Sequence, residues 1–168
     1  VKFVGVLCFQ FLSVVFCLGR AGIVGADGEI HQGVFDLGYL KHIPGMTVMA
    51  PKDGRELTQM MDMALTLDTP CAIRYPRGSA PQLGFDTELE YGRSLRLVSG
   101  GDVVDIWALG SMVEKALDAA EMLADHGIDA GVVNMAFVKP LDTDMLIRSA
   151  GQHTVSYKHL TLPTNNTG

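Results

Sequence analysis

The stretch R-A-G-I-V-G-A-D-G-E-I-H-Q-G-V-F-D, from Arg20 to Asp36, decides how the rest of the chain is interpreted. It follows an apolar run, residues 12–18, that has the length and β-branched content of a buried strand. Its four glycines allow positive φ angles and close approach to a ligand, and open α/β sheets bind their ligands in loops after strands. A cation, a carboxylate and an imidazole in one loop can bind an anionic, hydroxylated substrate and transfer protons. The spacing alone fits an ordinary glycine-rich loop equally well.

Apolar runs and helical patterns alternate along the chain, which predicts an α/β fold with parallel sheets covered by helices. Asp53 and Glu56 have the spacing of a capping box at a helix start. The apolar members of that helix predict a buried face made of Leu57, Met60, Met61, Ala64, Leu65 and Leu67. Strands are expected at 14–18, 46–50, 71–75, 103–109 and 130–135, and helices at 34–42, 54–67, 112–126 and 143–149. Residues 79–100 lose this rhythm and are typical of a linker with one strand at 94–98.

Composition excludes several classes of protein. The chain has 168 residues, enough for one ordinary domain or two smaller pieces, and 48% of them are hydrophobic, as in a globular protein with a substantial core. A net charge of −6 and the lack of any basic run argue against nucleic-acid binding. The three cysteines, Cys8, Cys17 and Cys71, have no metal-ligand spacing, and their odd number predicts buried reduced thiols in a cytoplasmic protein.

The glycine-rich stretch resembles the signature of the 1-deoxy-D-xylulose-5-phosphate synthases, a transketolase-like family that depends on thiamine diphosphate. Further matching blocks follow in the family's order: Tyr39-Leu40 with Ile43-Pro44, Met49-Ala50-Pro51, Ala72 to Gly78, Ala108 to Val113 and Val133 to Asp142. The resemblance covers roughly residues 11–154. It implies a partial transketolase-type pyrimidine-binding domain (1–80), a linker (81–101), the start of a transketolase C-terminal α/β domain (102–154) and an atypical tail (155–168).

The N-terminal apolar run imitates a secretory signal, because Lys2 precedes the mostly apolar residues 3–18. It is short and interrupted for a membrane span. By the resemblance its second half is a core strand of the catalytic domain, so the protein is expected to be cytoplasmic and not bound to a membrane. The first ten residues match the family poorly, and 155–168 look like translated adapter sequence at a truncated end.

The resemblance implies a role for four residues. His31 corresponds to the active-site histidine, which contacts the acceptor substrate and can transfer a proton, and Asp27 is expected to bind a substrate hydroxyl. Arg20 and Arg77 correspond to the pair that binds the phosphate of glyceraldehyde 3-phosphate, which suits the permanently charged, bidentate guanidinium group. Arg77 is preferred to Arg74 because it follows the strand end, where ligands gather.

Structural explanations of the same residues remain open. Without the resemblance, His31 fits an ordinary loop histidine, Asp27 a turn-former beside a glycine and Arg77 a surface ion pair. The chain also departs from the family at Gly19, where the family has an aspartate before the arginine. This replacement removes a carboxylate and puts full activity in doubt.

The resemblance implies a fragment of an enzyme that condenses pyruvate with D-glyceraldehyde 3-phosphate, with loss of CO2, to supply precursors of isoprenoids, thiamine and pyridoxal. The full-length family forms homodimers. In these proteins, a domain with a Gly-Asp-Gly motif holds thiamine diphosphate and Mg²⁺, and that domain lies upstream of the segment matched here. No cofactor-binding or metal-binding residue is therefore expected in this chain. The isolated chain is expected to be inactive and to bind the cofactor weakly at best.

Three other interpretations remain. Transketolases resemble G-E-D-G-P-T-H-Q-P at this loop, which fits G-A-D-G-E-I-H-Q-G less well. The beta subunits of 2-oxoacid dehydrogenases are naturally separate chains, but their loop differs more. A non-catalytic packing or regulatory module is the third, and the joint presence of Arg20, Asp27, His31 and Arg77 argues against it.

Overall fold

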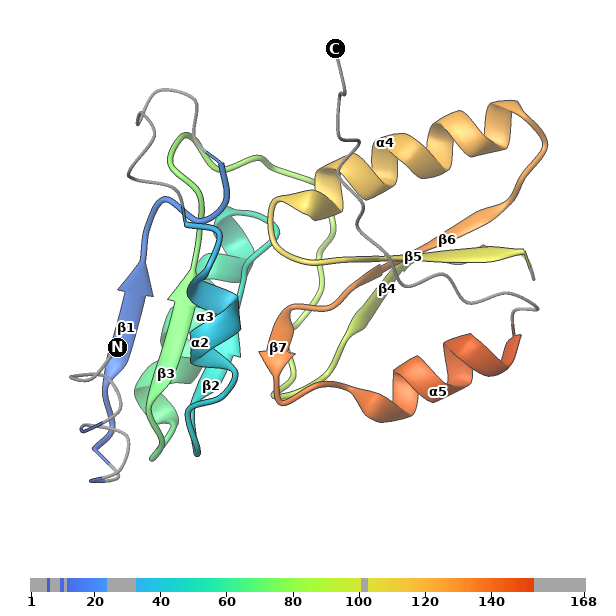
Figure 1. Ribbon diagram of the computed structural model, residues 1–168. Coiled ribbons are helices and arrows are strands. Elements are labelled where there is room, and N and C mark those ends of the chain that lie inside the picture. Colours follow the sequence, from blue (N-terminus) through green and yellow to red (C-terminus); the bar gives the residue numbers. More distant parts are fainter. Residues whose placement is uncertain (1–5, 7–9, 11, 24–32, 101–102, 153–168) are drawn as a thin grey trace, which may run out of the picture.

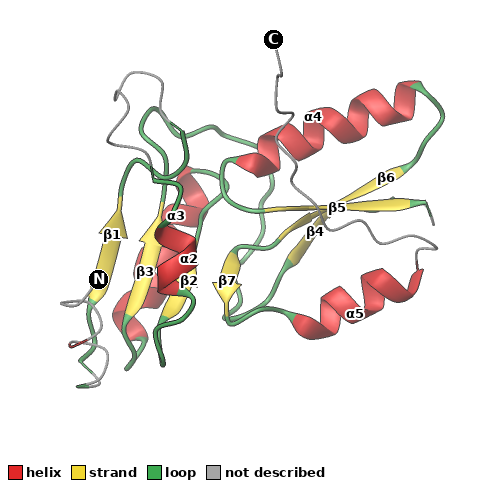
Figure 2. Cartoon of the chain, in the orientation of Figure 1, coloured by secondary structure: helices red, strands yellow, loops and turns green. Residues whose placement is uncertain are grey.

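The computed structural model describes residues 6, 10, 12–23, 33–100 and 103–152, which form two sheets with helices packed on them (Figures 1 and 2). The first sheet has the spatial order β1 (Val15–Leu18), β3 (Cys71–Arg74), β2 (Thr47–Met49) and β7 (Phe137–Lys139). The second has the order β4 (Leu95–Val98), β6 (Ala130–Asn134) and β5 (Val104–Ala108). The helices are α2 (Asp36–Leu40), α3 (Gly54–Thr66), α4 (Met112–Asp125) and α5 (Thr143–Gln152). The predicted α/β class is confirmed.

Side chains of successive strand residues point to opposite faces of the first sheet, and both faces are buried. Strands β1, β3 and β2 run parallel. Val48 and Ala72 pack with Leu40 of α2 on one face. Met49 and Ile73 pack with α3 on the other. Their strands therefore consist of nearly continuous apolar runs, as the sequence predicted.

Helix α3 begins at the predicted cap. The Asp53 carboxylate accepts a hydrogen bond from the Glu56 amide (2.8 Å), and the Glu56 carboxylate accepts one from the Lys52 amide (2.6 Å). The second bond goes one residue further back than in a standard capping box. The predicted burial of Leu65 is wrong, since 75% of this residue is exposed. The row Glu56, Met60 and Ala64 faces the sheet, and Leu65 lies about 100° around the helix from Ala64.

The second sheet is mixed, and α4 and α5 lie on opposite faces of it (Figure 1). Strand β5 is parallel to β6, whereas β4 is antiparallel to β6. Strand β4 lies inside the stretch expected to be a linker and is the strand predicted there at 94–98. Helix α4 ends at Asp125, and Gly127 follows its C-cap with a φ of +74°, which allows the Ile128 amide to bond the Leu123 carbonyl at 3.0 Å.

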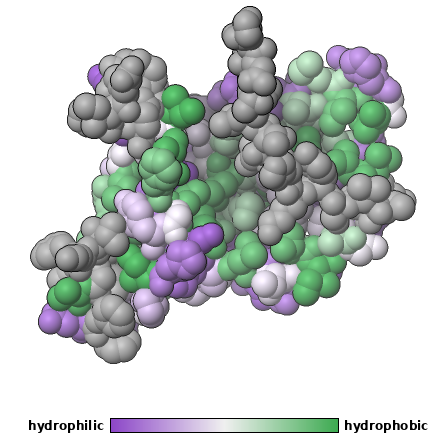
Figure 3. Space-filling view, viewed as in Figure 1, coloured by the Kyte–Doolittle hydropathy of each residue, from purple (hydrophilic) through white to green (hydrophobic). Residues whose placement is uncertain are grey.

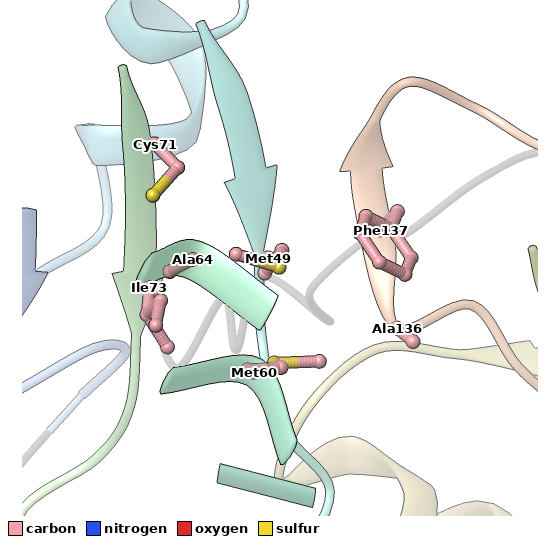
Figure 4. Packing of buried hydrophobic residues seen from close by; sticks show 7 residues of the cluster. All are labelled: Met49, Met60, Ala64, Cys71, Ile73, Ala136 and Phe137. Atoms are coloured by element: carbon pink, nitrogen blue, oxygen red, sulfur yellow. The ribbon is translucent and has the colours of Figure 1, made fainter. Parts of the chain in front are cut away.

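Strand β7 was not predicted, and it joins the two sheets. The chain leaves β6, turns at Ala136 with a φ of +52°, and then pairs antiparallel with β2 of the first sheet. Figure 4 shows Met49 and Met60 between Ile73 and Phe137, which is 1% exposed. The main core is therefore built from both halves of the chain.

The structure also tests the predicted burial of the cysteines and shows which apolar residues are exposed. Cys71 is buried as predicted, and burial raises the pKa of its thiol to about 11. The predicted burial of Cys17 is wrong, because this thiol is exposed on the edge strand β1, and Cys8 lies outside the described residues. Apolar residues reach the surface over α5 (Figure 3), where Ile147 is 70% exposed. Within the described residues, no helix has the length and apolar character to cross a bilayer.

Candidate functional site

The candidate site lies at the edge of the first sheet where β1 and β3 end. Leu18 and Arg74 are paired in register, and the chains stay paired beyond the strands: Tyr75 donates to Leu18 (3.0 Å) and Ala21 donates to Tyr75 (3.0 Å). This pairing brings the segments carrying Arg20 and Arg77 to one edge, although they lie far apart in the sequence. Both arginines are exposed there. The carboxyl ends of parallel strands are where α/β sheets bind ligands.

The backbone at Arg20 is in an unusual conformation. Its φ of +64° lies in the left-handed region, which an arginine adopts only at a cost of about 1 kcal/mol or more. Strain of this kind persists where the surrounding structure holds the chain, and it is frequent at ligand sites. The segment after β1 therefore keeps a strained conformation that an ordinary turn does not require.

Two glycines close the base of the loop after Arg20. Gly22 and Gly33 exchange backbone hydrogen bonds in both directions, each 3.0 Å long. A Cβ atom on Gly33 would overlap the carbonyl oxygen of Arg20 and lie 3.0 Å from the Cα of Ala21. Gly33 is therefore required by a close backbone approach. Asp27 and His31, predicted as substrate-binding and catalytic residues, lie outside the described residues.

Arg74 is bonded to other residues of the protein, whereas Arg77 is expected to bind the phosphate of the substrate. Its Nε donates to Asp36 Oδ2 (2.8 Å), and a terminal nitrogen donates to Asp36 Oδ1 (3.3 Å) and to the Gly33 carbonyl (3.2 Å). Both side chains are nearly buried, with 13% and 10% exposed. Sequence reasoning assigned Arg74 and Asp36 no role, because nothing in their local pattern indicates that they meet.

A second polar group, which sequence reasoning also missed, is buried where the two halves meet. Asn134 of β6 is fully buried, donates to the Glu56 carboxylate (2.7 Å) and accepts from the Ala136 amide (3.1 Å). Lys52 is 3% exposed, and its ammonium group donates to Asp53 (2.8 Å). Burial raises the pKa of Glu56, while the bonds from Lys52 and Asn134 oppose that rise. This network, Lys52–Asp53–Glu56–Asn134, joins the start of α3 to the second sheet.

The Lys139 to Asp142 motif supports structure at both of its ends. The Lys139 ammonium donates to the carbonyls of Lys41 (3.3 Å) and Ile43 (2.7 Å), just after α2. The Asp142 carboxylate accepts from the amides of Ser94 (2.9 Å) and Met145 (3.0 Å) and so caps α5. These contacts explain the motif without a catalytic role.

Replacing Asp142 by alanine is expected to lower the free energy of unfolding by about 1.5 kcal/mol, since α5 loses its cap and the Ser94 amide its acceptor. Burial opposes ionisation of Asp142, but the bonds from Ser94, Met145 and Arg93 outweigh it and hold the pKa below 3.8. The folded state therefore binds this proton less tightly than the unfolded state. The contribution is complete above about pH 4 and is lost as the pH falls through the lowered pKa.

Urea unfolding of wild type and Asp142→Ala between about pH 2.5 and pH 7 measures this difference. Asp144→Ala serves as the control, because the Asp144 side chain is 64% exposed and forms a surface ion pair with Arg93. It is expected to change stability by less than about 0.5 kcal/mol. An equal loss in both variants, or a loss that does not shrink in acid, would contradict the assignment.

The described residues do not fit the metal and diphosphate of a thiamine cofactor. No three His, Cys, Asp or Glu side chains gather in a metal-binding arrangement within the described ranges. The nearly buried Asp36 is already paired with Arg74. We therefore assign none of the described residues to that end of the cofactor.

Comparisons with known proteins agree with this geometry. Residues 6–82 match the family "Transketolase, pyrimidine binding domain", and residues 92–157 match "Transketolase, C-terminal domain". The 1-deoxy-D-xylulose-5-phosphate synthase of Caldanaerobacter subterraneus is 48% identical over 84% of this chain. A 1-deoxy-D-xylulose-5-phosphate synthase of Geobacter sulfurreducens is 50% identical over 86%. The chain spans about a quarter, 23%, of the length of either relative.

Solved structures show the same fold. A split-gene transketolase, described as an inactive β4 tetramer, superposes on 87% of this chain with a TM-score of 0.77 and 37% identity, and the match covers 47% of that protein. The chain therefore belongs to the transketolase-like family of thiamine-diphosphate-dependent transferases, and its sequence is similar to one segment of the 1-deoxy-D-xylulose-5-phosphate synthases.

Proposed function

We propose that this chain is the acceptor-binding segment of a 1-deoxy-D-xylulose-5-phosphate synthase, which joins pyruvate to D-glyceraldehyde 3-phosphate with loss of CO2. The product would feed isoprenoid, thiamine and pyridoxal synthesis. The observation that carries the proposal is the shared sheet edge of Arg20 and Arg77, combined with about 50% identity to synthases. Two exposed guanidinium groups at one strand edge suit a phosphate-bearing substrate.

The proposed roles are those that the family resemblance implies, and the chemistry of each side chain suits its role. Arg20 and Arg77 bind the acceptor's phosphate and fix the acceptor at the sheet edge. Asp27 accepts a hydrogen bond from an acceptor hydroxyl. His31 transfers a proton at the acceptor's carbonyl oxygen, since an imidazole both donates and accepts protons near neutral pH. Thiamine diphosphate, if bound in the complete enzyme, would supply the carbon-carbon bond-forming chemistry, while the residues of this chain bind and orient the acceptor.

The remaining parts of the proposal concern the complete protein. Thiamine diphosphate and Mg²⁺ would be held by other parts of a homodimer, so we expect the isolated chain to be inactive and to bind the cofactor weakly. The split-gene transketolase, described as an inactive tetramer, is a relative of which 47% matches this fold. A cytoplasmic location suits Cys17 and Cys71, which are free thiols within the part of the chain that the structure describes. Turnover of pyruvate by the purified chain would contradict the predicted inactivity.

Transketolase is the second candidate, because the superposed relative carries that name. The first candidate is tested through its donor substrate, because the synthase consumes pyruvate. A chimera in which residues 12–152 replace the matching segment of the Geobacter sulfurreducens synthase tests the first candidate directly. Failure of a folded chimera to use pyruvate and glyceraldehyde 3-phosphate would count against it.

In that chimera, Arg77→Gln is expected to raise the KM for glyceraldehyde 3-phosphate about thirtyfold, the effect of losing about 2 kcal/mol of charge-assisted hydrogen bonding. The KM for pyruvate should change less than about twofold, because pyruvate lacks a phosphate. Arg55→Gln is the matched control, since Arg55 is half exposed and pairs with Asp86. An unchanged KM for the acceptor would remove Arg77 from the site.

A further inference from the structure

Arg74 is bonded to a segment, residues 33–36, that lies far from it in the sequence. It is the last residue of β3, three positions before Arg77, and its guanidinium group reaches back to Asp36 and to the Gly33 carbonyl. The pair with Asp36 uses two nitrogens and both carboxylate oxygens, the rigid fork geometry that Arg forms and Lys cannot. Because both side chains are nearly buried, water screens the pair only weakly.

Gly33, which Arg74 holds through its carbonyl, also contacts the backbone of Arg20. Its backbone is bonded in both directions to Gly22, and it packs so closely on the Arg20 carbonyl that a Cβ atom would overlap that oxygen. The left-handed backbone of Arg20 has to be held by its surroundings, and Gly33 lies against its carbonyl group. Arg74 is therefore connected to Arg20 by a hydrogen bond to the Gly33 carbonyl and by the tight backbone contact between Gly33 and Arg20.

We propose that Arg74 is a positioning residue that, through Asp36 and Gly33, holds Arg20 in the conformation in which it binds one phosphate group together with Arg77. Arg74 itself does not contact the ligand. It connects the two arginines because its backbone continues toward Arg77 while its side chain fixes the segment packed on Arg20. The identity of the ligand, a phosphorylated acceptor, rests on the proposed function.

Amide hydrogen exchange on the 168-residue chain tests the mechanical part without any activity. In Arg74→Gln, the amides of Gly22 and Gly33 should exchange about tenfold faster, equivalent to losing about 1.4 kcal/mol of local protection. The Ala50 amide, bonded to Ala136 at 2.9 Å in the core, should keep its wild-type rate. Arg74→Lys should behave like Arg74→Gln, and Arg55→Gln like wild type. Unchanged exchange at Gly22 and Gly33, or equal acceleration at Ala50, would overturn the proposal.

Kinetics of the chimera test the positioning role. Arg74→Gln should lower kcat/KM for glyceraldehyde 3-phosphate about tenfold and leave kcat/KM for the unphosphorylated acceptor D-glyceraldehyde within about twofold. A purely structural defect would lower both values together, and that outcome, or no change in either, would overturn the proposal. If the unsubstituted chimera does not use glyceraldehyde 3-phosphate, the proposed function is refuted. The hydrogen-exchange experiment does not depend on activity and would still test the positioning by Arg74.

Discussion

Replacing Asn134 by leucine is expected to lower the free energy of unfolding by about 3 kcal/mol. Leucine has a similar volume, so the loss reflects hydrogen bonding more than a cavity. The Glu56 carboxylate, 3% exposed, loses a donor at 2.7 Å, and the buried Ala136 amide loses its acceptor. Both groups stay buried without these partners, which is the costly way of losing a hydrogen bond.

The loss of unfolding free energy in Asn134→Leu should depend on pH in a defined direction. Burial raises the pKa of Glu56 above 4.5, so the folded state binds its proton more tightly than the unfolded state. Stability from this group is complete below about pH 4.5 and falls as the pH rises through the raised pKa. Losing the bond from Asn134 raises that pKa further. The destabilisation by Asn134→Leu should therefore be smaller near pH 4 than near pH 7.

Urea unfolding at both pH values measures these effects, with Gln59→Leu as the control. The Gln59 amide makes one partly buried hydrogen bond to the Thr87 carbonyl (3.0 Å), so its replacement should cost about 1 kcal/mol or less. If Asn134→Leu costs no more than Gln59→Leu at pH 7, the network does not join the two halves of the chain as described.

Replacing Gly131 by alanine is expected to cost about 3 kcal/mol for a single added methyl group. Gly131 lies in β6, and a Cβ atom there would overlap an oxygen of Asp105 and approach an Arg96 nitrogen at 2.7 Å. Asp105 is held by Arg96 through two bonds of 2.6 Å and by the Ser149 hydroxyl at 2.6 Å. The methyl group must displace a nearly buried carboxylate from these partners.

Gly38→Ala provides a control with the opposite sign. Gly38 lies inside α2 with no atom within 4 Å of an added Cβ, so alanine should raise stability by about 0.5 kcal/mol through helix propensity. Urea unfolding of both variants compares the same chemical change in two surroundings. In Gly131→Ala combined with Asp105→Asn, the losses should be less than additive, because both act on the same carboxylate. Strict additivity, or a loss near zero in Gly131→Ala, would contradict the predicted clash.

The sequence alone determined those features of this protein that depend on neighbours along the chain. Apolar runs predicted the three parallel strands of the first sheet, β1, β2 and β3. The Asp53 cap was also predicted, because it acts on a residue within the same helical turn. The glycine-rich stretch indicated the family, because its residue types and spacing recur there. Burial of individual side chains at the edges was less certain, as Leu65 and Cys17 show.

Only the tertiary structure decided which distant residues meet. Strand β7 is three residues long, too short for a periodic signal, and it exists because β2 offers an edge for pairing. The pairs Arg74–Asp36 and Asn134–Glu56 join elements from different parts of the chain, and each partner alone fits an ordinary polar residue. Their energies depend on burial, which arises only when the sheets and helices have packed.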